Sequence, residues 1–240
     1  MKTNPLCVDL SHWDPATSYP KLKTAGIPAV IYKATQGQSY CDPTYKEQRR
    51  MARDAGMLWG AYHFADGTSP QGQADHFLLF AEIGPADLFC LDFEDNQNSS
   101  MSIDGAHQFI DCVESALNRP GELVFYSGNR VKDLLGNKKD AYLGTLRLWL
   151  AQYGSNPVCQ CSWSSWWLWQ YTDGQYGPGP YTFPGLDQSG VDCNSFEGSA
   201  HQLAAQWASG SLAPAPEPPD IIATITVIAP AGVQIKVVQQ

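Results

Sequence analysis

Three acidic side chains stand within four positions at the end of an apolar run, in the stretch CLDFED at residues 90–95. Side chains two positions apart on a strand point to the same side, so we expect Asp92 and Glu94 to face one space. Two carboxyl groups held close together take different pKa values, which leaves one protonated as an acid and one ionised. Cleavage of a glycosidic bond requires such a pair. Asp95 is predicted to belong to the following loop.

Two more acids are expected at the same place. Asp9 ends the strand-like run LCVDL, and Asp192 lies in the run VDCNSF. A lone Asp at a strand end is more often a helix cap or a loop anchor than a catalyst, and for either residue alone we favour that interpretation. In a parallel barrel, however, the carboxyl ends of the strands form the active face. The four acids together therefore predict a catalytic cluster of Asp9, Asp92, Glu94 and Asp192.

Aromatic and amide side chains repeat near the ends of the same apolar runs. Sugar rings present flat C–H faces, which stack on aromatic rings, and hydroxyl groups, which bond to amides and acids. Core packing is the ordinary role of a single Trp or Tyr, and we predict it for Trp59 and Trp167. Repetition beside the acids favours a sugar cleft, with the candidates His12, Trp13, Tyr62, His63, Tyr126, Trp149, Gln152, Tyr153, Trp169, Gln170 and Tyr171.

The signatures of other common reactions are missing from the sequence. It has no G-x-S-x-G, G-x-x-x-x-G-K or H-E-x-x-H motif. His12 and His63 could meet at the mouth of a barrel, so a metal-dependent hydrolase stays open, although we predict no metal and no cofactor. Cys159 and Cys161 form a C-x-C pair with no second pair at zinc-ligand spacing. The seven cysteines, mostly in apolar context, are predicted to be reduced core residues.

The elements that must position these residues alternate between strands and helices. Eight apolar, β-rich runs are separated in the first half of the chain by segments of helical period. Strands buried on both faces and joined by helices belong in a parallel sheet, and eight of them indicate closure into a barrel. A doubly wound open sheet is the alternative. The predicted strands are 6–10, 28–34, 57–64, 87–93, 122–128, 147–153, 166–171 and 191–196.

Three helices have clear ends in the sequence. The first is expected to run from a cap at Asp42, with Pro next in sequence, to Gly56. The second opens at Ser69, again before Pro, and ends near Gly84. The third helix follows Ser102, with one apolar face formed by Ile103, Ala106, Phe109, Ile110, Val113 and Leu117. After the fifth predicted strand the helical pattern fades, and Gly-, Pro- and Ser-rich stretches connect the last strands.

Composition limits the class of partner. The net charge is −9 with only 15 Lys and Arg, which argues against nucleic acid because phosphate binding needs clustered cations. Aromatics make up 12 % of the chain, a surplus that is typical of ligand clefts. The start, MKTNPLCVDL, lacks the apolar region of a secretion signal. No apolar run approaches the roughly 20 residues that cross a bilayer, so we predict no membrane insertion.

The end of the chain differs in composition from the rest. Residues 1–208 are predicted to form the barrel, and SGSLAPAPEPPD at 209–220 reads as a Pro-rich, extended linker. Residues 221–240 read as two strands around a Pro-Ala-Gly turn, with one apolar face. A lone hairpin is marginal in water. We therefore expect it to dock on the barrel or to mediate self-association as a homo-oligomer.

Taken together, the motifs resemble glycoside hydrolase family 25, the lysozymes of the N-acetylmuramidase type, many of them phage endolysins. The resemblance covers residue 6 to about residue 200, in order and with compatible spacing. The tail departs from the family's usual companions, because it is too short for a typical wall-binding module and shows no repeat. The stretches that carry the resemblance are VDLSHW, AVIYKATQG, GAYHF, LDFE, VFYSGN, LWLAQY, LWQYT and VDCNSFEG.

The resemblance implies an α/β fold, a modified TIM-type barrel of five β/α units followed by three antiparallel-leaning strands. It also implies cleavage of the β-1,4 bond between N-acetylmuramic acid and N-acetylglucosamine in peptidoglycan glycan strands. Glu94 would be the general acid, Asp92 the partner that orients or stabilises the substrate, and Asp9 and Asp192 an acidic floor. The positions expected near the cleft are Tyr62, Lys33, Tyr126, Trp149, Gln152, Tyr153, Trp169 and Gln170.

Two alternatives stay open at this stage. The chain could be a carbohydrate-binding protein that keeps the barrel without catalysis, although the intact Asp-x-Glu pair speaks against it. The spacing of that pair does not fix the distance between the carboxyl groups, so a retaining, an inverting and an acetamido-assisted route are all compatible with it. The expected location is the host cytoplasm, with release to the cell wall through a membrane pore; a bacterial cytosolic protein is the alternative.

Overall fold

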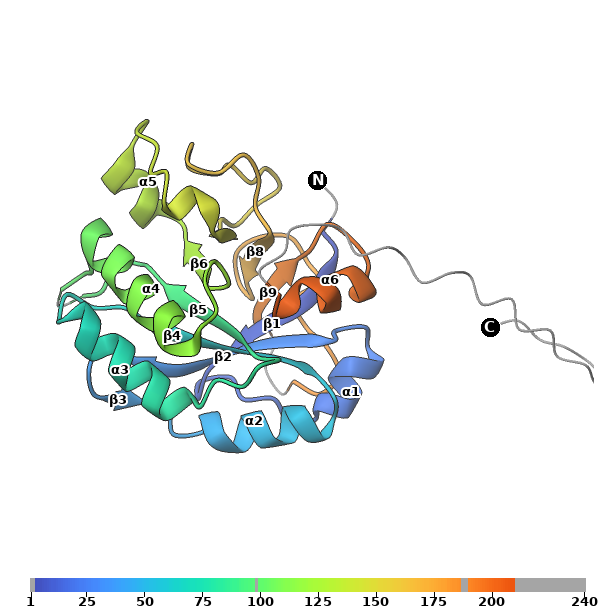
Figure 1. Cartoon of the computed structure of the whole chain (residues 1–240). Coiled ribbons are helices and arrows are strands. Elements are labelled where there is room, and N and C mark those ends of the chain that lie inside the picture. The colour runs from blue at the N-terminus through green and yellow to red at the C-terminus, as the bar shows by residue number, and fades with distance from the viewer. Residues whose placement is uncertain (1–2, 98, 187–189, 210–240) are drawn as a thin grey trace, which may run out of the picture.

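The strands form one sheet that closes on itself (Figure 1). The computed structural model describes residues 3–97, 99–186 and 190–209. All eight predicted strands are confirmed, and a two-residue strand, β3, is added to them. The bounds are β1 Pro5–Leu10, β2 Ala29–Gln36, β3 Tyr40–Cys41, β4 Leu58–Phe64, β5 Leu88–Asp92, β6 Val124–Ser127, β7 Arg147–Ala151, β8 Leu168–Asp173 and β9 Asp192–Ser195.

Strand pairing establishes the closed barrel. The order is β1-β9-β8-β7-β6-β5-β4-β2-β3, and pairing of β1 with β2 joins the two ends. The open-sheet alternative is therefore wrong. Neighbours from β1 through β2, β4, β5, β6 and β7 to β8 run parallel, whereas β9 runs antiparallel to both β8 and β1. The expectation of three antiparallel-leaning strands is corrected to one, because the long 152–167 connection lets β8 return parallel to β7.

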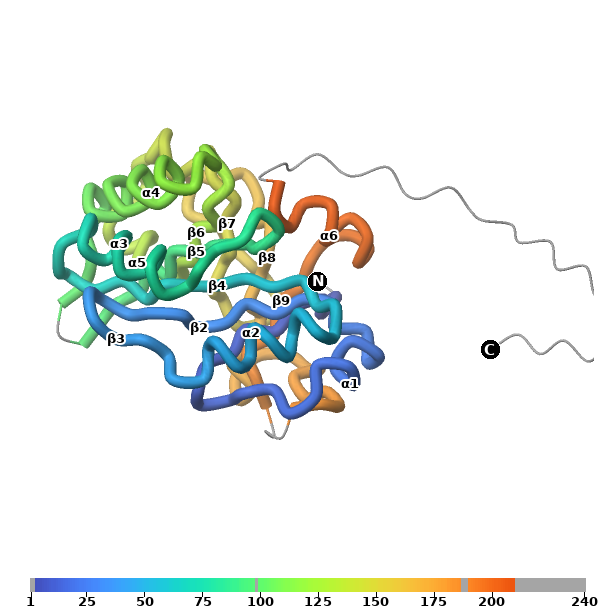
Figure 2. The backbone as a smooth tube through the Cα atoms, turned by 60° about the horizontal axis from the view of Figure 1, so that its bottom comes forward, coloured from blue at the N-terminus to red at the C-terminus, as the bar shows by residue number. Residues whose placement is uncertain are grey.

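Five helices follow the first five barrel strands and lie outside the barrel, which confirms the five β/α units. α2 packs against β2 and β4, and α3 packs against β2 and α4 (Figure 2). A sixth helix, α6, follows β9 and was not predicted. The helices are α1 Tyr19–Thr24, α2 Tyr45–Asp54, α3 Pro70–Ala81, α4 Ile103–Leu117, α5 Asn129–Leu135 and α6 Ala200–Trp207, with a 3-10 turn at Leu143–Thr145.

The helix starts follow the predicted caps in two cases out of three. The side chains of Ser69 and Ser102 accept hydrogen bonds from backbone N–H groups three residues on, and α3 and α4 begin directly after them. α2 begins at Tyr45, two residues later than predicted. The Asp42 carboxylate accepts the N–H of Thr44 at 3.0 Å, which makes a turn ahead of the helix. Its other oxygen, Oδ2, accepts the backbone N–H of His12, in the loop after β1.

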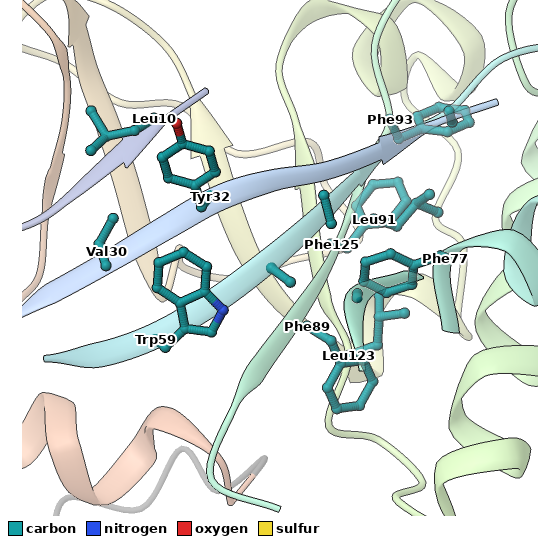
Figure 3. Close-up of a cluster of buried hydrophobic side chains, with 14 of the residues drawn as sticks. Leu10, Val30, Tyr32, Trp59, Phe77, Phe89, Leu91, Phe93, Leu123 and Phe125 are labelled. Atoms are coloured by element: carbon teal, nitrogen blue, oxygen red, sulfur yellow. The ribbon is translucent and has the colours of Figure 1, made fainter. Parts of the chain in front are cut away.

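The outer core lies between the strands and the surrounding helices. Phe89, Leu91 and Phe93 alternate along the chain and point outwards into apolar packing. Figure 3 shows these side chains beside Phe77 of α3 and Phe125 of β6. Burial on this side fixes the orientation of β5, and the intervening residues of the strand consequently face the barrel interior.

The amino-terminal end of the barrel is closed by α6, which Figure 1 shows beside β1 and β9. The indole of Trp207 donates to the backbone oxygen of Trp59 at 2.8 Å, and the indole of Trp167 donates to Gln206 at 2.9 Å. Arg147, buried at the start of β7, donates to the oxygen of Gln206. The core roles predicted for Trp59 and Trp167 are confirmed, since both are almost fully buried.

The seven cysteines are all free, and only three of them are core residues. Cys7, Cys90 and Cys193 are buried, whereas the remaining four are partly or fully exposed.

Within the described ranges, none of the helices has the length and apolar character needed to cross a membrane. The predicted linker from residue 210 onward and the predicted hairpin at 221–240 lie outside the described residues.

Candidate active site

Asp92 is the last residue of β5 and points into the open end of the barrel. Its backbone is held on both sides, because Ala65 donates its N–H to the Asp92 oxygen and Phe93 donates to the Tyr126 oxygen. The Oδ1 atom is buried and has no hydrogen-bond partner among the described residues. Burial, reinforced by the neighbouring Glu94, raises the pKa of Asp92, and Lys33 opposes this rise. The carboxyl group is thus desolvated, and its Oδ1 lacks, within the described part of the chain, a donor that would stabilise the charged form.

Glu94 follows two residues later on the loop and lines a hollow of about 470 Å³. Burial, together with the charges of Asp9 and Asp95, raises its pKa to about 7. A carboxyl group with this pKa keeps its proton in mildly acidic solution and can act as a general acid. The prediction that Asp92 and Glu94 share a side of the strand agrees with this arrangement. The other residues that line the hollow are Asp95, Gly128, Asn129, Arg130, Ala151, Gln152 and Tyr153.

Asp9 and Asp192 face each other across the β1–β9 pair. Asp9 accepts hydrogen bonds from the amides of Gln170 (3.1 Å) and Asn194 (2.7 Å), which favour its charged form. Burial outweighs these bonds and raises the pKa of Asp9 to about 6. Burial and the charge of Asp9 raise the pKa of Asp192 to about 10, so the two acids share one proton near neutrality. The acidic floor that the resemblance implied is therefore a hydrogen-bonded pair.

Three of the predicted cleft residues lie in a buried layer beneath these acids. Tyr126 donates its hydroxyl to the oxygen of Gln170 at 2.9 Å, and the Gln170 amide then donates to Asp9. The indole of Trp149 donates to the oxygen of Asn194 at 2.6 Å. All four side chains are buried, so they orient Asp9 rather than meet a ligand directly. Asn194 was missed, although its i, i+2 spacing from Asp192 in VDCNSF placed it on the same face.

Tyr62 and Lys33 lie at the mouth beside Asp92. The ring of Tyr62 meets that of Trp149 edge-on at 6.5 Å. Burial raises the pKa of Tyr62, and so do the charges of Asp92 and Asp9, so its hydroxyl stays a hydrogen-bond donor. Lys33 donates to Gln36 at 2.8 Å, and burial lowers its pKa while Asp92 supports its charge. Lys33 is thus the cation that balances part of the acidic cluster.

The wall opposite these residues is formed by Gln152 and Tyr153, both beside the hollow as predicted. The oxygen of Gln152 accepts from Lys132 at 2.7 Å, which fixes its side chain. Trp169 lies on the outer side of the barrel, fully buried, and its indole donates to the backbone oxygen of Gln152 at 2.6 Å. The structure therefore places Trp169 behind the wall and not in the cleft. Arg130, which lines the hollow, was not predicted from the sequence.

The two histidines that could have formed a metal site are held apart by different partners. His63 is fully buried outside the barrel, stacked on Phe109 and bonded to Thr35 and Gln73. His12 bonds instead to Asp42, on the rim of the mouth. The expectation that they could meet is wrong, because neighbouring side chains of β4 point to opposite sides and His63 takes the outer one. Among the residues that the structure describes, no group of three His, Cys, Asp or Glu side chains is placed to hold a metal ion.

Comparison with known proteins identifies similar chains. Lysozyme M1 of Streptomyces globisporus is 27% identical over 218 residues, which cover 82% of this chain and 69% of that protein. The autolytic lysozyme of Clostridium acetobutylicum is 30% identical over 174 residues, 69% of this chain and 50% of that protein. The crystal structure of the bacterial lysozyme from Streptomyces coelicolor superimposes with a TM-score of 0.72 at 26% identity, over 88% of this chain and 100% of that one.

The family model described as glycosyl hydrolases family 25 matches residues 8–180. The matched segment contains Asp9, Asp92 and Glu94, and ends before Asp192. The barrel topology, the acids at its mouth and this match agree with one another. The chain belongs to glycosyl hydrolases family 25.

Proposed function

We propose that this protein is a lysozyme of the muramidase type, which hydrolyses the β-1,4 bond between N-acetylmuramic acid and N-acetylglucosamine in peptidoglycan. The observation that carries the proposal is Glu94, a partly buried carboxyl group with a pKa raised to about 7 in a hollow beside Asp92. Family membership supports the class of reaction, and the lysozymes among its relatives support the class of substrate.

The chemistry assigned to Glu94 is proton transfer to the glycosidic oxygen. The leaving sugar departs as an alcohol when that oxygen is protonated, and Glu94 supplies the proton because burial keeps it in the acid form. Its ionised form then accepts a proton from the incoming water. Asp95 and Arg130 form an ion pair at 2.8 Å beside it. That pair holds the loop on which Glu94 lies.

The chemistry assigned to Asp92 is orientation and stabilisation of the sugar. Asp92 is 8% exposed at the mouth, so its carboxyl group can accept a hydrogen bond from a donor of the substrate, and an N-acetyl group of an amino sugar presents an amide N–H of that kind. Burial raises the pKa of Asp92 and Lys33 opposes this rise. In its ionised form, Asp92 stabilises the positive charge that develops on the sugar in the transition state. Tyr62 is a neutral donor next to the same carboxyl group.

The test is product analysis on purified peptidoglycan. Wild-type protein is expected to release fragments with muramic acid at the reducing end, and Glu94→Gln to lower the rate at least about 100-fold with an unchanged circular dichroism spectrum. Glucosamine at the reducing end would contradict the bond assignment. Binding of glycan without any cleavage by the wild type would favour the alternative of a non-catalytic carbohydrate-binding barrel.

The origin and cellular location are proposed as those of an endolysin, held in the host cytoplasm and released to the wall through a membrane pore. The support is the set of seven free cysteines, three of them buried, which is typical of a chain that folds in a reducing compartment. Expression in a bacterial cytoplasm is expected to cause lysis only when a pore-forming protein is co-expressed. Lysis of equal extent without the pore would contradict the proposal.

A further inference from the structure

An aromatic cluster stands on the rim of the barrel mouth, and it includes the predicted cleft candidates His12 and Trp13. Trp13 is 79% exposed, and its ring lies 4.5 Å from that of His12. Tyr40, at the start of the short strand β3, lies 6.1 Å from His12 on the other side. We call Trp13, His12 and Tyr40 the rim cluster. The flat face of this exposed indole is open to stacking by an apolar surface of a ligand.

The rim cluster is held rigidly by buried polar groups. The carboxylate of Asp42, whose side chain is fully buried, accepts the backbone N–H of His12 at 3.0 Å and contacts its Nδ1 at 2.9 Å. In the same turn, Asp14 accepts the N–H of Ser11 at 2.7 Å. Trp13 is therefore presented by a loop that is fixed before any ligand arrives, which lowers the entropy lost on binding.

The chemistry of the rim cluster suits a sugar ring. A carboxylate can only accept, so the Nδ1 of His12 donates to Asp42, and the Tyr40 hydroxyl lies 3.1 Å from the same nitrogen. An exposed indole offers a flat face for C–H groups, and Nε2 of His12 and the Tyr40 hydroxyl offer partners for the hydroxyls at the edge of the ring. No cation is needed for this kind of contact.

The rim cluster lies on the opposite side of the catalytic acids from the hollow. Around the eight-stranded barrel, β1 and β2 lie opposite β6 and β7, whose ends form the hollow beside Glu94. The amine of Lys33 lies 5.4 Å from the centre of the Tyr40 ring, and its charge acts on Asp92. The acids thus lie between the hollow on one side and the rim cluster on the other.

We propose that Trp13, supported by His12 and Tyr40, is a binding subsite for a sugar of the same glycan strand, remote from the bond that is cleaved. A polymer that enters the hollow and crosses the acids reaches the rim of β1 and β2 next. This inference rests on the proposed function for the identity of the strand. Trp13 acts in binding and takes no part in proton transfer.

The experiment compares Trp13→Ala with Leu79→Ala on peptidoglycan glycan strands sorted by length. Leu79 is 81% exposed on α3, a matched apolar surface residue away from the rim cluster. A remote sugar binds the ground and transition states equally, so its loss raises KM and leaves kcat unchanged. On long strands Trp13→Ala is expected to raise KM about tenfold, which corresponds to about 1.4 kcal/mol. Trp13→Tyr should restore most of the affinity, and Leu79→Ala should match the wild type.

The length dependence separates a subsite from a structural role. On the shortest fragments that are still cleaved, Trp13→Ala should behave as the wild type, because these do not reach the rim cluster. An equal KM for Trp13→Ala and wild type on long strands would overturn the proposal, and so would equal losses on long and short strands. If the wild type cleaves nothing, the proposed function fails, and calorimetric binding of long strands to wild type and Trp13→Ala still decides the subsite.

Discussion

At the scale of single residues, the acids at the mouth have pKa values above their ordinary range. Asp9 and Asp192 share a proton, Asp92 is desolvated, and Glu94 is protonated up to about pH 7. Each of these states is imposed by burial and by neighbouring charge of the same sign. Two predictions follow from the charges around Glu94.

The first concerns Asp95, whose charge contributes to the raised pKa of Glu94. Asp95→Asn removes that charge, so the ionised form of Glu94 becomes less unfavourable and its pKa falls. We expect the alkaline limb of the pH profile of kcat/KM to move to lower pH. Asp54→Asn is the matched control, because Asp54 and Asp95 are both paired with Arg and both 68% exposed. A profile that stays in place for Asp95→Asn would contradict the assignment of Glu94 as the titrating acid.

The second prediction concerns the free energy of unfolding. At alkaline pH this free energy is reduced, because Glu94 must ionise while it is buried. The unfolded chain ionises this group near 4.5 and the folded chain at about 7, so stability falls as the pH rises between these values. Glu94→Gln cannot ionise and should be more stable than the wild type at pH 8, by up to about 3 kcal/mol.

Urea denaturation at pH 4 and pH 8 measures this difference, which should vanish at the lower pH. Glu47→Gln, at an exposed position on α2, is the control: it keeps Glu94, so its stability should change with pH in the same way as that of the wild type. A Glu94→Gln variant that is less stable than the wild type at pH 8 would show that the carboxyl group has stabilising contacts in the folded chain.

At the scale of elements, a buried histidine joins β4 to two neighbours. His63 contacts Thr35 of β2 at 2.8 Å and Gln73 of α3 at 3.0 Å. The Gln73 amide donates to backbone oxygens of Asp66 and Thr68, so its oxygen accepts from Nε2 of His63 and the ring is neutral. Burial lowers the pKa of His63 to about 4.

The packing of this element is therefore sensitive to acid. Between pH 6.5 and about pH 4 the unfolded chain protonates His63 and the folded chain does not, so stability falls as the pH is lowered, by up to about 3 kcal/mol. His63→Gln should remove this part of the pH dependence, and His201→Gln on the exposed face of α6 should keep it. Parallel stability curves for the wild type and His63→Gln would contradict the prediction.

The same elements explain what could be predicted from the sequence. Alternation along CLDFED gave the orientation of Asp92 and Glu94, and Ser before Pro70 and Ile103 gave two helix starts, because these signals are local. Trp149 and Gln170 were predicted beside the cleft from their place near strand ends. The depth of a side chain within a barrel depends on how the barrel closes, so their burial could not be predicted. α6 is short, and its role comes from contacts of Trp207 with distant strands.

At the scale of the whole molecule, the tail at 221–240 stays a prediction. Its apolar alternation favours self-association, and the described barrel ends at residue 209. We expect light scattering to show a mass above that of the monomer for the full chain, and the monomer mass after deletion of residues 210–240. Cleavage of short soluble fragments should be unchanged by the deletion, since the acids all lie before it. A monomeric full chain would contradict the prediction.

The antiparallel strand β9 determines when, during synthesis of the chain, the barrel can close. It inserts between β1 and β8, and Asn194 reaches Asp9 across 185 positions of sequence. On the ribosome, the residues up to Glu94 emerge long before β9, and domains fold as synthesis proceeds. Until residue 195 has emerged from the ribosome, Asp9 lacks the hydrogen bond from the Asn194 amide and the proton that it shares with Asp192. A nascent or prematurely terminated chain therefore carries its acids in an unclosed barrel, and hydrolytic competence is acquired only with the last strand.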